Sequence, residues 1–467
     1  MPAITFPSSS APGQRAAEGQ GRLVNVFPTP EGNQAVWRQT PGLSSFASTT
    51  RSGFRGGMQI GATLLAAWDG AVCTYAANGA ETLLTGTVAG ENPVTIAVNN
   101  ARPTPDIVVV DRLNGAFTVS GSTVSAFSDP DLPAPNSVAF LDGYFLFSIG
   151  DGRIFASDLN DPIVDALSFA NCEAKPDGLT VGKVSGQLFY GFGPESTEIW
   201  QNAGTSPFPL ARVQVVSIGI RGPHCVAGDQ IGWDSGLIMV SSDGKVRQWT
   251  GYQANVISTP AVERSIDGVT DTSQLFAFVS VSRDIQSWTL TGPGFTWEYN
   301  LNTKSWHERR SLGRADWRGR FSCKAFGSWI CGDAENGTLW RIDPNATREG
   351  TIDVPRLVES VASRGFPARF PIYRADFDFT VGTASETGID PIQTAPSVRI
   401  SWSDDGGNTW SIPVIRALGR QGDYGRRVSL TGVGSSNQHG RKWRLEWSDP
   451  VYVSLIGGAF NEKPSVR

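Results

Sequence analysis

Short apolar runs separated by glycine-containing turns recur along most of the chain. The clearest case is 236–251, where the apolar run Leu237 to Val240 is followed by a Ser-Ser-Asp-Gly turn and by a second strand with Val246 and Trp249. Such a turn joins two strands tightly, because glycine and aspartate adopt the backbone angles that it requires. The pattern therefore predicts a β-hairpin.

The same hairpin returns six more times. Close copies occupy 142–159, 185–202 and 326–343, and no long helical pattern interrupts the series. The seven copies are marked, at intervals of 37 to 50 residues, by Gly61, Asp106, Gly143, Gly186, Gly236, Asp284 and Gly327. Repeats of about four strands, none able to bury both faces alone, are typical of a β-propeller. The spacing predicts six or seven blades, with only one hairpin of each visible; irregularly spaced β-sandwich strands are the alternative.

The hairpin repeat stops at both ends of the series, and the flanking segments differ from it in sequence pattern. Residues 1–20 are rich in Ser, Pro, Gly and Ala, which predicts a flexible N-terminal arm. We expect 21–346 to be the propeller, with Leu23 to Phe27 as the N-terminal strand that closes its last blade. Residues 347–374 are then a linker, and 375–467 a second domain.

The second domain alternates apolar and polar positions, which indicates half-buried antiparallel strands and a β-sandwich-like fold. The residues that share a face are, in two strands, Val398, Ile400 and Trp402, and Trp443, Leu445 and Trp447. The predicted class is all-β. In the repeats, four tryptophans at similar places on the second strand are interpreted as core and not as a platform for sugars: Trp200, Trp249, Trp297 and Trp340.

Composition narrows the classes of function. The 53 glycines and 29 prolines favour turns over helices, and the net charge of −5 lacks the basic footprint of a nucleic-acid-binding protein. The N-terminus has no basic stretch followed by an apolar one, so we expect no signal peptide. The longest uncharged apolar stretch, Met58 to Trp68, is too short to cross a bilayer. We therefore expect a soluble protein made in a reducing cytoplasm, with no membrane-spanning segment.

Signatures of catalysis and of metal binding are missing from the sequence. The three histidines, His224, His307 and His439, have no metal-ligand spacing, and no phosphate-binding or dinucleotide-binding loop is present. The five scattered cysteines form no CxxC pair and are expected to be small buried thiols. A Ser or Cys triad stays open, because its members meet only in the fold. We predict no enzyme activity, no cofactor and no metal.

One sharp motif lies in the second domain. The stretch SDDGGNTW fits the Asp box, a tight hairpin turn, and its defining residues are Ser403, Asp405, Gly407, Thr409 and Trp410. In such a turn the aspartate accepts backbone N–H groups and the glycine allows positive φ, so the motif is structural and not catalytic.

A basic cluster follows the Asp box. It comprises Arg416, Arg420, Arg426, Arg427, Arg441, Lys442 and Arg444. The cluster is a candidate docking patch for an acidic partner or a phosphate backbone, and a solvated face of the sandwich is the alternative.

An ordered series of motifs resembles the tail hub or nozzle proteins of short-tailed bacteriophages, the packaged DNA stabilization family. The series contains NSVAFLDGYFLFS, GRIFASDLNDP, GQLFYGFGPESTEIWQNAG, ISTPAVE, TWEYNLNTKSWHERRS, SDDGGNTWS, GRQGDYGRRV and WRLEWSDPV. The resemblance runs from about Arg22 to Gly458, and the order of its motifs is more specific than any one of them.

The resemblance implies a structural virion protein of the phage tail, assembled in the host bacterial cytoplasm as a homo-hexamer. Such a ring closes the tail channel, helps to retain packaged DNA and gives it an exit path. The implied partners are a head-to-tail adaptor ring, a tailspike or tail fibre, a tail needle or plug protein, and double-stranded DNA that passes without sequence-specific binding. An acidic ring suits this passage, so the basic cluster is expected to face protein and not DNA.

A propeller glycosidase or carbohydrate-binding protein acting on host surface glycans is the alternative function. The Asp box and the fifteen tryptophans motivate it. A sialidase, however, carries several such boxes on its blades together with an arginine cluster and a tyrosine nucleophile, whereas here the box occurs once, outside the repeats.

Overall fold

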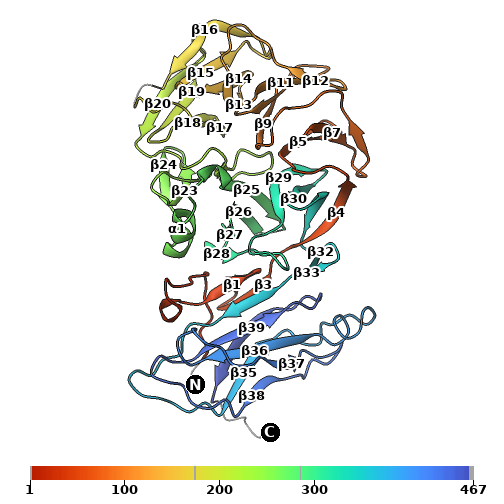
Figure 1. Cartoon of the computed structure of the whole chain (residues 1–467), viewed down its shortest axis with the longest axis vertical. Coiled ribbons are helices and arrows are strands. Elements are labelled where there is room, and N and C mark those ends of the chain that lie inside the picture. Colours follow the sequence, from red (N-terminus) through yellow and green to blue (C-terminus); the bar gives the residue numbers. More distant parts are fainter. Residues whose placement is uncertain (1–2, 173–174, 284, 462–467) are drawn as a thin grey trace.

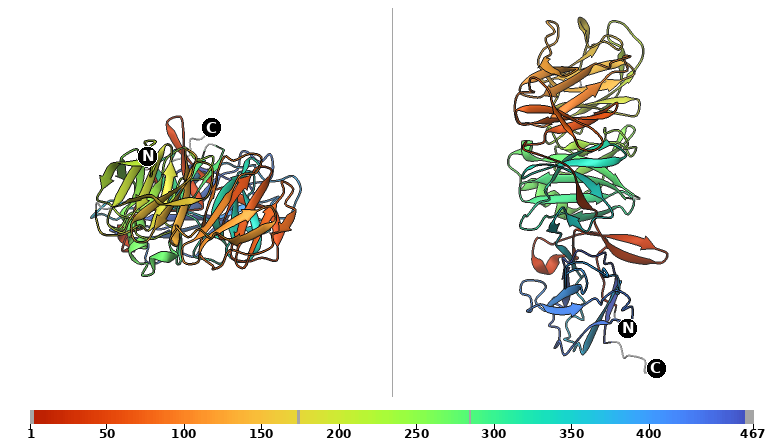
Figure 2. Two further views of the ribbon diagram at one scale, coloured as in Figure 1. Left: turned by 90° about the horizontal axis from the view of Figure 1, so that it is seen from above. Right: turned by 90° about the vertical axis from the view of Figure 1, so that its right-hand side faces the viewer.

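The computed structural model describes residues 3–172, 175–283 and 285–461 and is elongated (Figures 1 and 2). Four-stranded sheets stand around a common axis at one end, and the C-terminal domain forms the other end. Helix within these ranges is limited to α1 (Pro260–Asp267) and two short 3-10 turns, η1 (Ala16–Glu18) and η2 (Thr272–Gln274). The predicted all-β class, a propeller with a C-terminal sandwich-like domain, is confirmed.

The described residues form seven blades, each with four antiparallel strands. Blade one contains β5 (Gly56–Ile60), β6 (Thr63–Trp68), β7 (Ala71–Tyr75) and β8 (Glu81–Leu83). Blade two contains β9 (Val94–Val98), β10 (Ile107–Asp111), β11 (Gly115–Ser120) and β12 (Thr123–Ala126). Blade three contains β13 (Pro135–Leu141), β14 (Tyr144–Ile149), β15 (Arg153–Ser157) and β16 (Val164–Asn171). Blade four contains β17 (Val181–Ser185), β18 (Leu188–Phe192), β19 (Thr197–Asn202) and β20 (Leu210–Val216).

The last three blades follow in the same order. Blade five contains β21 (Val226–Ala227), β22 (Ile238–Val240), β23 (Val246–Thr250) and β24 (Gln253–Val256). Blade six contains β25 (Phe276–Ser282), β26 (Ile285–Gly292), β27 (Phe295–Asn300) and β28 (Ser305–Glu308). Blade seven contains β29 (Gly319–Ala325), β30 (Ser328–Asp333), β31 (Gly337–Asp343) and, from near the N-terminus, β4 (Gly42–Thr49).

The hairpins visible in the sequence are the two middle strands of each blade. These strands are covered on both faces, so their apolar residues form continuous runs, as in the almost wholly buried β14. The outer strands β8 and β12 are mostly exposed and carry no such run. Six of the seven predicted markers lie one or two residues before the second strand of a blade, and the seventh, Asp284, lies outside the described residues.

The strand that closes the ring is β4, and the prediction that Leu23 to Phe27 closes it is corrected. Strand β4 pairs antiparallel with β31, from Gly42 opposite Asp343 to Thr49 opposite Gly337. Strand β1 (Arg22–Val24) instead lies between β28 and β34 (Arg356–Glu359). Four strands precede the first blade, and only their pairing in the fold shows which of them closes the ring.

The N-terminal arm is packed and not free. Ile4 and Phe6 are buried in the core of the C-terminal domain, and the Ile4 N–H donates to the Gly458 carbonyl at 2.8 Å. The Ser10 N–H donates to the Trp306 carbonyl at 2.7 Å. Ser/Pro-rich composition suggested an unpacked arm, but two apolar side chains and a few backbone hydrogen bonds hold it.

The predicted linker contains strands of its own. Strands β32 (Arg348–Glu349), β33 (Ile352–Asp353) and β34 lie within it, and β34 belongs to a nine-stranded sheet. That sheet runs from β25 in blade six through β28, β1 and β34 to β39 (Lys442–Trp447), β36 (Ser397–Ser403) and β37 (Val414–Ala417). The propeller and the C-terminal domain are therefore joined by one continuous hydrogen-bonded sheet.

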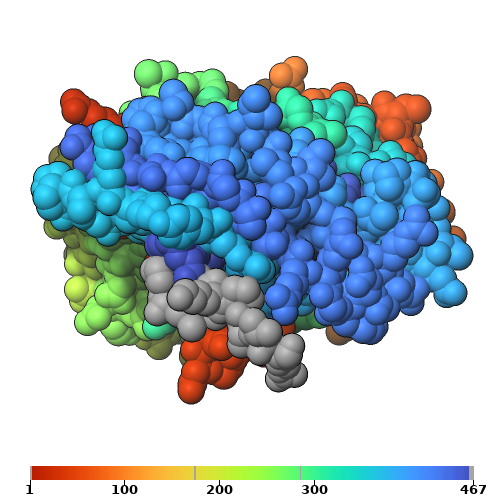
Figure 3. Space-filling model, turned by 90° about the horizontal axis from the view of Figure 1, so that it is seen from below, coloured from red at the N-terminus to blue at the C-terminus, as the bar shows by residue number. Residues whose placement is uncertain are grey.

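The far half of this sheet packs on a second, five-stranded sheet. Its order is β2 (Val26–Glu31), β3 (Gln34–Gln39), β40 (Leu455–Phe460), β35 (Arg374–Phe379) and β38 (Val428–Thr431). Ring pairs across the interface include Phe377 with Trp443 and Phe379 with Trp447, at centroid distances of 5.4 and 5.8 Å. The two sheets form the predicted sandwich, and the C-terminal residues, in blue, cover most of the face seen from below in Figure 3.

Candidate assembly surfaces

The Asp box forms the turn after β36. The Asp405 carboxylate accepts the Asn408 and Thr409 N–H groups at 2.9 Å and the Thr409 hydroxyl at 2.6 Å. Desolvation opposes ionisation of Asp405, but the hydrogen bonds from Thr409, Ser403 and Asn408 outweigh it and hold its pKa well below the usual range. Gly407 adopts a φ of 105°, and the Trp410 indole donates to its carbonyl at 3.2 Å. These contacts fix a turn and leave no carboxylate free for chemistry.

The seven basic residues of the cluster do not form one surface. Three of them bind partners within the protein. Arg441 is 1% exposed, pairs with Asp404 at 2.7 Å and donates to the Val433 carbonyl. Lys442 donates to the Ala16 carbonyl at 2.5 Å. Arg444 pairs with Glu359 at 2.7 Å and lies over the Trp410 ring. The sequence predicted one exposed basic cluster, but each of these three residues has a different partner inside the domain.

Of the remaining members, Arg416 lies on the edge strand β37, and Arg420, Arg426 and Arg427 lie in the loop between β37 and the edge strand β38. Arg416 donates to the Ser429 carbonyl at 2.8 Å, while Arg420, Arg426 and Arg427 are exposed. No carboxylate within ion-pair distance of these three is found in the described part of the chain. The exposed part of the predicted docking patch is therefore this loop.

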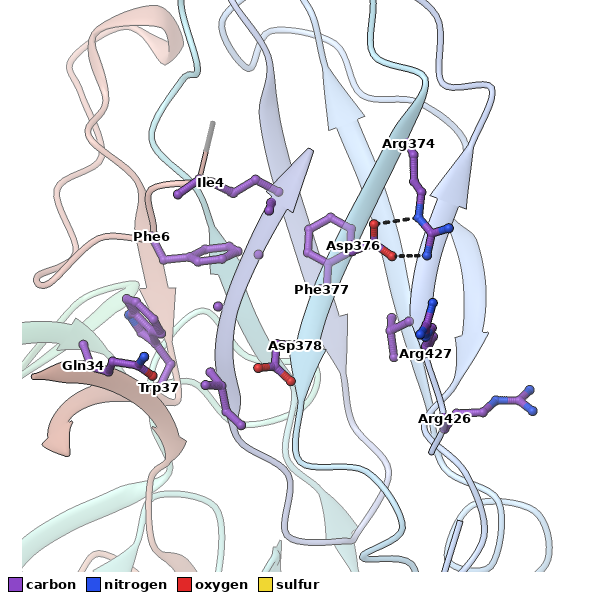
Figure 4. A pocket seen from close by; sticks show the side chains of 17 residues that line it. Ile4, Phe6, Gln34, Trp37, Arg374, Asp376, Phe377, Asp378, Arg426 and Arg427 are labelled. Carbon is purple, nitrogen blue, oxygen red and sulfur yellow. Dashed lines mark hydrogen bonds and ion pairs between the residues drawn. The ribbon is translucent and has the colours of Figure 1, made fainter. Parts of the chain in front are cut away.

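A groove of about 720 Å³ runs across the sandwich beside the loop. Figure 4 shows Ile4, Phe6 and Trp37 on one side and the Arg374–Asp376 pair, at 2.6 Å, on the other. Arg426 and Arg427 also line it, and Arg426 extends outward. Arg374 and Asp376 were not among the predicted site residues, although their i, i+2 spacing on a strand places both on one face.

The outer edge of blade three carries a second surface that the sequence analysis missed. Residues 129–171 contain seven aspartates and one arginine, a formal charge of −6. Asp158, Asp161 and Asp165 are exposed on and before β16, among exposed apolar side chains. The net charge of this segment, in contrast to that of the whole chain, is the sequence signal that could have identified this acidic surface.

The axis of the propeller is nearly filled. Residues from all seven blades surround about 140 Å³ of space, which holds roughly five water molecules. Its polar lining includes Arg112, His224 and Lys183, and Lys183 pairs with Asp229 at 2.7 Å. Desolvation and the charges of Arg112 and Lys183 lower the pKa of His224 to about 4, so its ring is neutral at pH 7. A nucleic acid cannot pass through so small a space.

The blade tryptophans, the cysteines, the metal-ligand residue types and the helices bear on other possible functions. The four blade tryptophans are buried, so none of them presents a face on which a sugar could stack. The cysteines are free thiols, of which Cys172 is half-buried and the others are buried. Among the described residues, no group of His, Cys, Asp and Glu is placed to hold a metal ion. None of the described helices has the length and apolar character needed to cross a membrane.

The fold and these surfaces define a β-propeller protein with an appended sandwich and exposed charged edges. Residues 21–347 match the family described as "Bacteriophage P22 Gp10, beta-propeller". The chain therefore belongs to this family of phage packaged-DNA stabilization proteins, which confirms the resemblance found in the sequence motifs. It is accordingly a phage tail protein of the virion.

Other comparisons add no functional detail. The computationally designed Ika8 protein is 11% identical, with a TM-score of 0.40 over 72% of this chain and 99% of that chain. The WD40 β-propeller domain of Doa1 is 12% identical, with a TM-score of 0.42 over 64% of this chain and 96% of that chain. The comparison with curated proteins gave no match.

Proposed function

We propose that six copies of this chain form a ring that closes the phage tail channel, helps to retain the packaged DNA and gives it an exit path at infection. The family match over residues 21–347 carries the proposal. The filled propeller axis supports it, because DNA that cannot thread one subunit needs a passage between several. A ring of copies provides such a passage.

Surface charge suits this role. The chain has a net charge of −5, and a duplex binds tightly where basic side chains replace its counterions. A passage lined by acidic or neutral surface lets DNA slide without a sequence-specific contact. The three exposed arginines of the sandwich then serve protein contacts.

The ring works by occupying space in an assembly and needs no catalysis. Its proposed neighbours are the head-to-tail adaptor ring, a tailspike or tail fibre, and a needle or plug protein. Assembly takes place in the host cytoplasm before the virion is released. The Asp box contributes a rigid turn between β36 and β37.

Negative-stain imaging of the purified chain mixed with its adaptor ring tests the proposal. We expect a sixfold ring capping the adaptor, with the adaptor alone as control. Adaptor particles without added density at the tail end would contradict it. A monomeric state of the chain by itself does not count against the proposal, since the adaptor can serve as the template.

A further inference from the structure

Two exposed surfaces lie at opposite ends of the molecule. The first, the acidic edge, consists of Asp158, Leu159, Asp161, Ile163, Asp165 and Leu167 beside the outer strand of blade three. The second, the basic loop, consists of Ile412, Ile415, Arg420, Tyr424, Arg426 and Arg427 around β37 and β38. Figure 1 places β16 at the top of the long axis and β37 and β38 near its lower end.

The acidic edge exposes large apolar side chains next to carboxylates. Leu159, Ile163 and Leu167 are 61%, 58% and 68% exposed. Strand β16 is the last strand of its sheet, and its pairing with β15 is interrupted between Val164 and Phe169, so the segment around Leu167 leaves the ladder. Apolar side chains gathered at one edge and surrounded by charge are typical of a protein interface.

The three carboxylates of this edge have no ion-pair partner among the described residues. Asp161 and Asp165 accept only local backbone N–H groups, from Ile163 at 3.1 Å and from Leu167 at 2.7 Å. Their charge is thus not neutralised within the chain and is available to a cationic partner.

The basic loop has the same construction with the opposite charge. Ile412, Ile415 and Tyr424 are 88%, 63% and 73% exposed. Residues 412–427 contain four arginines and one aspartate, a formal charge of +3. Strand β37 pairs with β36 alone and ends the nine-stranded sheet, so its outer backbone edge is open as well.

We propose that the acidic edge of one copy docks on the basic loop of the next copy, apolar side chains against apolar side chains and aspartates against arginines. The inference rests on the proposed ring and names the faces that join its subunits. The two faces lie at opposite ends of one chain, so the contact is head-to-tail. Such a heterologous contact closes into a ring when the rotation between copies divides a full turn.

Charge also favours this contact over a contact between two identical faces. Two acidic edges facing each other, or two basic loops, place like charges together, which disfavours a symmetric pair. Opposite charges fix the order of the contact and speed the encounter of the copies.

Charge reversal with rescue tests the docking. The variant Arg426→Glu/Arg427→Glu and the variant Asp158→Arg/Asp161→Arg should each lower ring formation on the adaptor by about tenfold or more. The chain that carries all four changes restores opposite charges across the contact and should assemble close to the wild-type level. Rings are counted by negative-stain imaging at fixed concentration and salt.

A matched variant and a folding check accompany this series. Lys324→Glu/Arg369→Glu makes the same change in charge as Arg426→Glu/Arg427→Glu, at exposed positions outside both faces. This variant should assemble normally. Thermal melting of each variant within a few degrees of the wild type shows that the fold is kept. If the wild type forms rings and the reversals form them equally well, the docking is wrong while the proposed function stands. If the wild type forms no ring on the adaptor, the proposed function itself fails.

Discussion

The propeller and the sandwich hold their strands together over very different distances along the chain. All four strands of blade one lie between Gly56 and Leu83, and each of blades one to six is similarly local. The five-stranded sheet of the sandwich instead joins both ends of the chain, with Trp37 opposite Leu455. Blades are therefore encoded locally, whereas the sandwich forms only after a very long loop has closed.

N-terminal deletions should separate the two regions most strongly. Removing residues 1–39 takes away β1, β2, β3 and the buried Ile4 and Phe6, so hydrogen exchange should show loss of protection in β35 and β40 while blades one to five stay protected. Removing residues 1–49 also deletes β4 and should expose β31. Equal loss of protection throughout the shorter deletion would show that propeller and sandwich unfold as one unit.

A buried ion pair between blades should have the next largest effect. Arg55 and Asp111 join blades one and two at 2.7 Å, with both side chains almost fully buried. Asp111→Ala leaves the Arg55 charge unpaired and should lower the free energy of unfolding by about 3–5 kcal/mol in urea titrations.

The exposed pair of Asp151 and Arg153 is the matched control for Asp111→Ala. Asp151→Ala should cost less than about 1 kcal/mol, because both side chains are accessible to water. Similar losses in the two variants would argue against a local, contact-based description of the blades.

Lowering the pH should destabilise blade six, because Glu298 becomes protonated. Burial opposes ionisation of Glu298, but the Arg309 guanidinium at 3.0 Å and the neighbouring His307 ring lower its pKa from 4.5 to about 2. Since the folded-state pKa lies below the unfolded value, this stabilisation is complete above pH 4.5 and is lost as the pH falls toward 2.

The variant Glu298→Gln isolates that contribution. The difference between wild type and variant in free energy of unfolding should be constant above pH 4.5 and shrink between pH 4.5 and 2, as measured by denaturant titration at a series of pH values. Curves that remain parallel through this window would exclude Glu298 as the titrating group.

The Asp box should have the smallest effect. Asp405→Asn weakens the acceptor of the turn hydrogen bonds and should cost about 1 kcal/mol, seen in the sandwich and not in the blades. Asp423→Asn, in the exposed loop, serves as control and should stay within about 0.5 kcal/mol. A loss of protection in the blades on Asp405→Asn would contradict the separation of the two regions.

Some of this architecture could be predicted because its signal is local. The middle strands of each blade are buried on both faces, so apolar runs and the turns between them appear directly in the sequence. Outer strands such as β8 and β12 are mostly exposed and were inferred only from the repeat length. The basic residues with partners inside the domain show the limit: Arg441 lies beside Asp404 only after β36 and β39 have paired.

The amino-acid sequence by itself determined the repeating hairpins, the class of fold and, through its ordered motifs, the family. Tertiary structure decided which N-terminal strand closes the ring, which arginines stay exposed and that an acidic edge lies at the end opposite to a basic one. The reason is physical: turns and strand burial depend on neighbours a few residues away, whereas ring closure, ion pairing and exposure depend on segments that meet across hundreds of residues.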